Sequence, residues 1–268
     1  MQHFQRTIQT KFRGCPSITA DVNDLLRESG VRGGYCIITL DDSSIALGIT
    51  SFWDARGLGD LLDEIDRNFP NRVDFLNQES PLDAAGRVRS AVIGNTAMLL
   101  ISDGKLVLGS SQGLVLLEFD GPRERGYHAA FAERPVVLTK HSLKTEYMGM
   151  HDLTPEIARA VEESGMKSGV CHVSMLHSTA GLLLCRGGAA AGKKIMQDIE
   201  RMVPTRADFK HRETASDAGG HVKTAITGSQ LSVIVENGKL LLSPEQAIVF
   251  AEYDGPRPRS YFVGILAV

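Results

Sequence analysis

The chain has 268 residues, enough for one large domain or two ordinary ones, and its 43% hydrophobic and 23% charged residues are typical of a soluble globular protein. A formal net charge of -3 provides no basic surface, so we expect no nucleic-acid partner. We expect no membrane partner, because no apolar run reaches the roughly 18 residues of a membrane span. We also expect a cytoplasmic protein, because the polar start "MQHFQRTIQTKFRG" has no signal-like apolar core and the four cysteines form no CxxC pair.

The second half of the chain repeats the first, with an offset of about 134 or 135 residues. Four colinear matches carry the repeat: "RESGVRGGYC" (27–36) with "EESGMKSGVC" (162–171), "FPNRVDF" (69–75) with "VPTRADF" (203–209), "DAAGRVRSAVIG" (83–94) with "DAGGHVKTAITG" (217–228), and "EFDGPRERGY" (118–127) with "EYDGPRPRSY" (252–261). A period this long indicates two copies of a whole domain, which we place at residues 1–134 and 135–268.

Each copy is predicted to begin with a strand, at 4–10 and at 136–145, followed by a helix. In the second copy this helix has Thr154 at the N-cap and ends at Gly165. An alternating run follows, in which Cys171, Val173 and Met175 share one face and His177 continues it.

Two further helices are expected in each copy: a long one at 58–68 and 191–202, and a short one that in the second copy runs from an N-cap at Asp217 to Gly228. Three apolar strands close the copy, two of them joined by the hairpin signal "ENGK" (236–239). We therefore expect an α+β fold, present twice.

Three histidines of the second copy are candidate metal ligands: His177, His211 and His221. Asp217 lies four residues before His221, so both share a helix face. Imidazole supplies neutral nitrogen ligands, and a nearby carboxylate fixes the tautomer or joins the metal. The pattern indicates a metal site with an open position, although chance assembly of unrelated polar residues stays an alternative.

The first copy has lost all three histidines together. The corresponding residues are Asp42, Asn77 and Arg87, whereas Asp83 keeps the carboxylate of Asp217. Their joint loss is easiest to explain if they formed one site, and we expect Asp83 to form an ion pair with Arg87 in its place.

Several other polar residues accompany the histidines. On a strand, Ser178 faces away from His177 and Thr179 returns to the same face, so Thr179 is the better contact with the site. Lys223 lies close to His221 near a helix N-terminus, where a phosphate is readily held. Arg257 and Arg259 suit phosphate by their planar shape, but both recur in the first copy, which equally favours structural ion pairs.

The second copy resembles the YjbQ-like family, also called UPF0047, at "LHSTAG…RADFKH…SDAGGHVKTAITG…NGKLLL…EYDGPRPR". The resemblance covers 136–268, and residues 1–134 match as a degenerate copy. It implies two tandem domains, each a mixed, largely antiparallel β-sandwich-like sheet with flanking helices, assembled as a homo-oligomer, with a trimer favoured. Where the family carries "N-E-N-x-D-P", this chain has "CRGGAAAG".

For function, the resemblance implies a divalent metal, expected to be zinc, bound by His177, His211 and His221, and a secondary thiamine-phosphate synthase activity on a small phosphorylated molecule. Catalytic roles are then expected for Asp217, Lys223 and Thr179. Substrate binding is expected for Gln246, Arg257 and Arg259. The alternative is a non-catalytic metal- or ligand-binding oligomer, with the first copy structural.

Overall fold

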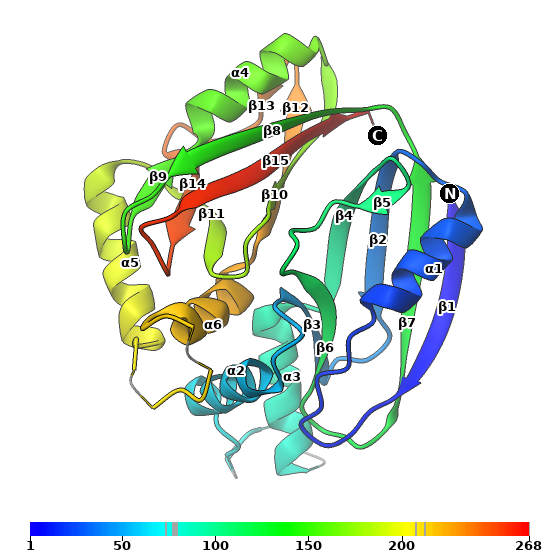
Figure 1. The fold of residues 1–268 in the computed structure, drawn as a ribbon, viewed down its shortest axis with the longest axis vertical. Coiled ribbons are helices and arrows are strands. Elements are labelled where there is room, and N and C mark those ends of the chain that lie inside the picture. The colour runs from blue at the N-terminus through cyan, green and yellow to red at the C-terminus, as the bar shows by residue number, and fades with distance from the viewer. Residues whose placement is uncertain (73, 77–79, 207, 212, 268) are drawn as a thin grey trace. The chain divides into compact units, whose positions relative to one another are not determined.

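The computed structural model describes residues 1–72, 74–76, 80–206, 208–211 and 213–267 (Figure 1). The chain divides into two compact units. The first unit comprises Met1–Leu106 and Gln112–Glu133, and the second comprises Val107–Ser111 and Arg134–Val268.

The first unit contains a five-stranded sheet and a two-stranded sheet. The order of strands in the larger sheet is β1-β7-β2-β4-β5, and β3 pairs with β6 in the smaller one. The elements are β1 (Gln2–Gln9), α1 (Thr19–Ser29), β2 (Gly34–Leu40), β3 (Ile45–Thr50), α2 (Ala55–Asn68), α3 (Pro81–Ile93), β4 (Thr96–Ser102), β5 (Lys105–Leu106), β6 (Gly113–Glu118) and β7 (Glu124–Glu133).

The second unit repeats this arrangement. Its five-stranded sheet has the order β13-β12-β10-β15-β8, and its smaller sheet has the order β11-β14-β9. The elements are β8 (Val136–Lys144), β9 (Met150–Asp152), α4 (Thr154–Ser164), β10 (Ser168–Met175), β11 (Ala180–Arg186), α5 (Ala189–Met202), α6 (Asp217–Thr227), β12 (Gln230–Glu236), β13 (Lys239–Leu240), β14 (Gln246–Glu252) and β15 (Pro258–Leu266).

Every strand pairing among the described residues is antiparallel. The two units therefore share one topology: β8, β15, β10, β12 and β13 follow the order of β1, β7, β2, β4 and β5. The expected α+β fold with largely antiparallel sheets is confirmed, and β9 is a short strand that the sequence pattern did not predict.

The core of the second unit lies between its two sheets and α4. The predicted stripe on β10 is confirmed, because Cys171 and Val173 are fully buried and Met175 is 1% exposed. They pack with residues of β11, β14 and β15 and with Ile157 and Val161 of α4. Each large aliphatic side chain buried in this way contributes about 1.5 to 3 kcal/mol, so the stripe anchors β10 and the turn that follows it.

Helix ends and the hairpin follow the predicted glycines, but two N-caps shift by one residue. Gly165 ends α4 with a φ of 69°, and Gly228 ends α6 with a φ of 87°. Thr154 is not the N-cap: it lies inside α4, its backbone N–H donates to Asp152, and its hydroxyl accepts from the backbone N–H of Ile248. The Thr154 hydroxyl therefore serves β14 instead of the helix end.

Asp217 is likewise the first residue of α6, with Ser216 in the N-cap position. Its carboxylate is thereby directed at the loop before the helix, where it accepts from the backbone N–H of Glu213 at 2.6 Å. The hairpin between β12 and β13 is confirmed, with positive φ at both Asn237 and Gly238 as a type I′ turn requires.

None of the helices in the described ranges combines the length and the apolar character required to cross a bilayer.

Two glycines of the first unit allow a matched test of backbone strain. A Cβ added at either Gly30 or Gly59 would meet no atom within 4 Å, but Gly30 has a φ of 68° at the end of α1, whereas Gly59 lies inside α2. We expect Gly30→Ala to lower the free energy of unfolding by about 1 to 2 kcal/mol, and Gly59→Ala to raise it by about 0.5 to 1 kcal/mol. Denaturant unfolding measures both, and equal effects would contradict the assignment of strain to Gly30.

Candidate functional site

The first turn of α6 and the loop before it bring His211 and Asp217 together. The His211 Nε2 atom lies 3.1 Å from the Asp217 Oδ2 atom, and both side chains are at least 94% buried. The other oxygen of Asp217 accepts from the backbone N–H of Ala218 at 2.8 Å. A carboxylate in the first turn of a helix is also favoured by the helix dipole, so Asp217 is a fixed anion facing an imidazole.

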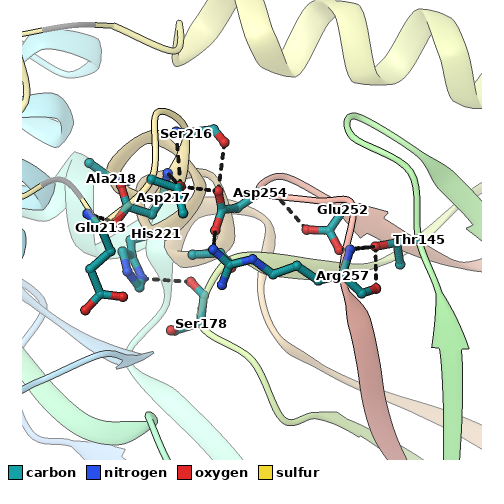
Figure 2. Close-up of polar contacts among 12 residues, drawn as sticks. Thr145, Ser178, Glu213, Ser216, Asp217, Ala218, His221, Glu252, Asp254 and Arg257 are labelled. Carbon is teal, nitrogen blue, oxygen red and sulfur yellow. Dashed lines mark hydrogen bonds and ion pairs between the residues drawn. The ribbon is translucent and has the colours of Figure 1, made fainter.

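His221 lies beside this pair on the same helix as Asp217, outside the group of ligand atoms that converge there. Its ring is edge-on to that of His211, with centroids 5.5 Å apart. Its Nδ1 lies 3.0 Å from the carbonyl oxygen of Ser178 (Figure 2). A carbonyl only accepts, so Nδ1 carries the proton and Nε2 has a free electron pair. Burial, and then the neighbouring His211, lower the pKa of His221, which keeps this ring neutral, as a metal ligand must be.

Glu213 is the third member of a group of converging ligand-type residues with His211 and Asp217, and sequence reasoning missed it. One ligand atom each from His211, Glu213 and Asp217 lie within 4.8 Å of one another. The Glu213 side chain is exposed and extends beside the ring of His221 (Figure 2). Its spacing, two residues after His211 and four before Asp217, was the available signal.

His177 occupies a different environment. It follows β10, and its Nε2 accepts a hydrogen bond from the backbone N–H of Ser260 at 2.9 Å. Burial, followed by the charge of Arg259, lowers the pKa of His177 to about 4. The ring is neutral, but the structure places neither His177 nor His221 in the group of His211, Glu213 and Asp217. The role of His177 as a ligand stays a prediction.

Thr179 and Arg259 belong to a buried ion-pair network. Arg259 donates from Nε to Glu252 Oε2 at 2.6 Å and also pairs with Oε1 through Nη2, while the same Nη2 contacts Thr179 Oγ1 at 3.0 Å. Glu252 is completely buried and Arg259 is 3% exposed. Burial alone would raise the pKa of Glu252, but hydrogen bonds from Arg259 and Thr145 outweigh it and lower the pKa.

The first unit contains the same network. Arg125 donates to both oxygens of Glu118 at 2.7 and 2.6 Å, as Arg259 does to Glu252. Thr10 donates to Glu118 as Thr145 donates to Glu252, at 2.7 Å in both units. This recurrence supports the structural alternative for Arg259.

Arg257 is the more accessible arginine of the pair. It contacts Asp254 Oδ2 at 2.9 Å, with 40% of its side chain exposed. Asp254 in turn accepts from the hydroxyls of Thr214 and Ser216 at the start of α6. In Figure 2 the Arg257 side chain extends towards Asp254, on the side where α6 begins. Asp254 therefore links the arginine to the histidine cluster.

Lys223 lies on α6 but its ammonium group pairs with α5, and Gln246 lies elsewhere in the unit. Lys223 is completely buried, with its Nζ 2.6 Å from Glu200 of α5. In the first unit, Arg89 contacts Asp66 of α2 at 2.9 Å in the corresponding pair. Gln246 begins β14, accepts from the backbone N–H of Ser243, and lines a separate cavity of about 770 Å³ beside α4. The structure does not bring Gln246 to the histidines.

The first unit has ion pairs where the second has its imidazoles. The expected Asp83–Arg87 pair is confirmed, with 2.9 Å between Arg87 Nη2 and Asp83 Oδ2. Asp42 contacts Arg125 at 2.6 Å. Asn77, the counterpart of His211, lies outside the described residues. In the first copy, arginines thus compensate both the retained Asp83 and Asp42, which stands in the place of His177.

The fold and this cluster define a duplicated α+β protein with a histidine–carboxylate cluster in one copy. A model of the family described as "UPF0047 protein YjbQ-like" matches residues 4–134 and again 139–268. The chain therefore belongs to this family and contains its domain twice.

Relatives match about half of the chain, as expected for single copies. A UPF0047 protein of Methanocaldococcus jannaschii is 35% identical over 132 residues, which cover 48% of this chain and 94% of that protein. YugU of Bacillus subtilis is 30% identical over 118 residues, covering 44% and 89%. A solved YbjQ-like protein of unknown function from Sulfolobus solfataricus has 27% identity and a TM-score of 0.48, covering 51% of this chain and all of its own.

Arg259 and Arg257 provide a matched test of the network. We expect Arg259→Met to lower the free energy of unfolding by about 3 to 5 kcal/mol, because it leaves the buried Glu252 carboxylate without its partner. Arg257→Met removes a half-exposed pair and should cost less than about 1 kcal/mol. Denaturant unfolding at neutral pH distinguishes the two, and equal losses would contradict the structural role of Arg259.

Proposed function

We propose that the second unit binds a divalent transition metal through His211, Asp217 and His221, with Glu213 as a further ligand, and acts on a small phosphorylated metabolite. The observation that carries the proposal is the 3.1 Å separation of His211 Nε2 and Asp217 Oδ2 beside the neutral ring of His221. Family membership by itself assigns no activity, so the argument rests on this cluster.

The donor set fits such an ion. Two ligand atoms about 2.1 Å from one metal, at right or tetrahedral angles, lie roughly 3.0 to 3.4 Å apart, a range that includes the observed separation. The mixture of imidazole and carboxylate suits zinc and related metals better than magnesium, which prefers oxygen ligands. The carbonyl of Ser178 orients His221 as an outer partner commonly orients a metal-binding imidazole.

A bound metal would supply Lewis-acid polarisation of a phosphoryl oxygen at this position. Of the cations predicted to bind phosphate, Arg257 supports the role best, because 40% of its side chain is exposed and Asp254 ties it to the start of α6. Lys223 and Arg259 are buried against Glu200 and Glu252. They would hold the framework of the site, and Thr179 would act through Arg259 in the same way.

A non-catalytic metal-binding role is the second candidate. It is favoured by the engagement of Lys223 and Arg259 in buried ion pairs that recur in the first unit. It is also favoured by "CRGGAAAG" (185–192), which stands where the family pattern has "N-E-N-x-D-P" and lacks its Asn, Glu and Asp. Thiamine-phosphate synthase chemistry stays a proposal under the first candidate, and a trimeric assembly accompanies either one.

Metal content tests the centre directly. We expect about one zinc-class ion per chain in protein purified without added metal, and at least a tenfold lower content in His211→Ala, Asp217→Asn and His221→Ala. His141→Ala is the matched control, because this partly buried histidine of the same unit contacts Thr139 and stacks on Tyr261. Elemental mass spectrometry provides the measurement, and full occupancy in the three variants would refute the centre.

The same experiment settles the role of His177. Loss of metal in His177→Ala would add it to the ligand set, whereas retained metal would restrict it to contacts with Ser260.

Activity separates the two candidate functions. We expect the metal-loaded protein to release phosphate or pyrophosphate from phosphate esters, or from a pyrimidine diphosphate mixed with a thiazole phosphate. Arg257→Met should lower kcat/KM by about 10- to 100-fold, equivalent to roughly 1.4 to 2.7 kcal/mol, if it orients phosphate. Full metal occupancy without any turnover would favour the non-catalytic role.

A further inference from the structure

The first unit contains a second cluster of histidine and carboxylate side chains. Its members are His3 on β1, His128 on β7 and Asp41, the residue after β2. The His3 Nε2 atom is 2.7 Å from the His128 Nδ1 atom, and the two rings stack with centroids 4.8 Å apart and planes 18° apart. On the other side of the same ring, His128 Nε2 lies 2.9 Å from Asp41 Oδ1. The three side chains form a continuous chain of polar contacts.

The antiparallel register places these residues together. His128 is opposite Gln5, so it is a diagonal neighbour of His3 on the adjacent strand. These positions face the exposed side of the sheet: His3 is exposed, and 36% of the His128 side chain is accessible. Asp41 reaches His128 by passing over Gly126, where a Cβ would lie 2.3 Å from the Asp41 carboxylate. The missing side chain at Gly126 therefore opens the path for Asp41.

Asp41 determines which nitrogen of His128 is available. An ionised carboxylate only accepts, so the proton of the neutral ring lies on Nε2. His128 Nδ1 then accepts the hydrogen bond from His3 Nε2–H, and a bound metal ion would take the place of that proton. This carboxylate–histidine order is the arrangement that commonly orients metal-binding imidazoles.

The cluster is specific to the first copy. Thr10 corresponds to Thr145, Asp42 to His177, and Tyr127 to Tyr261, which makes Leu138, Leu176 and Phe262 the counterparts of His3, Asp41 and His128. Three polar residues from separate parts of the chain thus replace three apolar ones at once. Joint replacement is expected if the three residues act as a single cluster.

We propose that His3 and His128 bind a divalent transition metal on the exposed face of this sheet, with Asp41 as the outer partner that orients His128. Two nitrogens about 2.0 to 2.1 Å from one ion at a right angle lie roughly 2.9 Å apart, and at the tetrahedral angle roughly 3.4 Å apart. The observed 2.7 Å is closer to the right-angled case, which favours Cu²⁺ or Ni²⁺ with imidazole ligands. The remaining positions are left for water or for a donor from another molecule.

The site is independent of the metal centre proposed in the second unit, so each can be tested without the other. Titration of the His211→Ala/His221→Ala protein with NiCl₂ and CuCl₂ by calorimetry isolates the first unit. We expect saturation at one ion per chain, with affinity falling at least tenfold in both His3→Ala and His128→Ala. Asp41→Asn should weaken binding by about tenfold, within the range for outer partners of metal ligands.

His141→Ala serves as the matched control, because it removes a histidine outside the cluster and should leave the affinity unchanged. Electron paramagnetic resonance of the Cu²⁺-loaded protein should show two imidazole nitrogens, reduced to one in His128→Ala. The single variant His128→Ala, with His211 and His221 intact, should bind one Cu²⁺ ion fewer per chain than the wild-type protein. This comparison keeps the test valid if the double variant folds poorly. Binding that requires His3 but not His128, or a single-imidazole spectrum in wild type, would overturn the proposal.

Discussion

The buried pair of Glu252 and Arg259 holds the functional end of the second unit in place. Glu252 ends β14 and Arg259 lies in β15, so their two hydrogen bonds join strands from the two different sheets. Thr145 at the end of β8 and Thr179 before β11 attach to the same pair. Removing two charges from water is costly unless both are fully satisfied, and this requirement restricts the geometry of all four segments.

The position of the histidine cluster follows from this network. Thr179 packs against Gly220 of α6, where a Cβ would lie 3.1 Å from that of the threonine. Asp254, two residues beyond Glu252, accepts hydrogen bonds from the loop that enters α6. The ion pair therefore fixes both sides of the helix start on which Asp217 and His221 lie, and the carbonyl of Ser178 sets the orientation of the His221 ring.

The two copies keep this framework and differ in the groups attached to it. Asp42 and Arg87 of the first copy stand where the second copy has His177 and His221, and they form ion pairs with Arg125 and Asp83. The retained carboxylate of Asp83 therefore has a cationic partner. A carboxylate that lost a metal or an imidazole would otherwise be partly buried without compensation. The first copy has its own imidazoles in His3 and His128, on a sheet face that is apolar at the corresponding positions of the second copy.

The sequence by itself determined the duplication, which follows from comparing the two halves of the chain, and with it the α+β class. It also determined the buried stripe of β10 and the glycines that end α4 and α6, because alternation and glycine are signals within a single element. It further singled out His211 and His221, since their absence from the first copy could be read without a structure, and Asp217 by its position four residues before His221. Tertiary structure decided the rest. The exposed Glu213 belongs to no periodic pattern that the sequence would reveal. The separate surroundings of His177 depend on which backbone N–H lies opposite its ring. The buried partners of Lys223 and Arg259 come from segments 7 to 23 residues away in sequence, and spacing alone does not reveal whether a cation faces a ligand or a buried carboxylate.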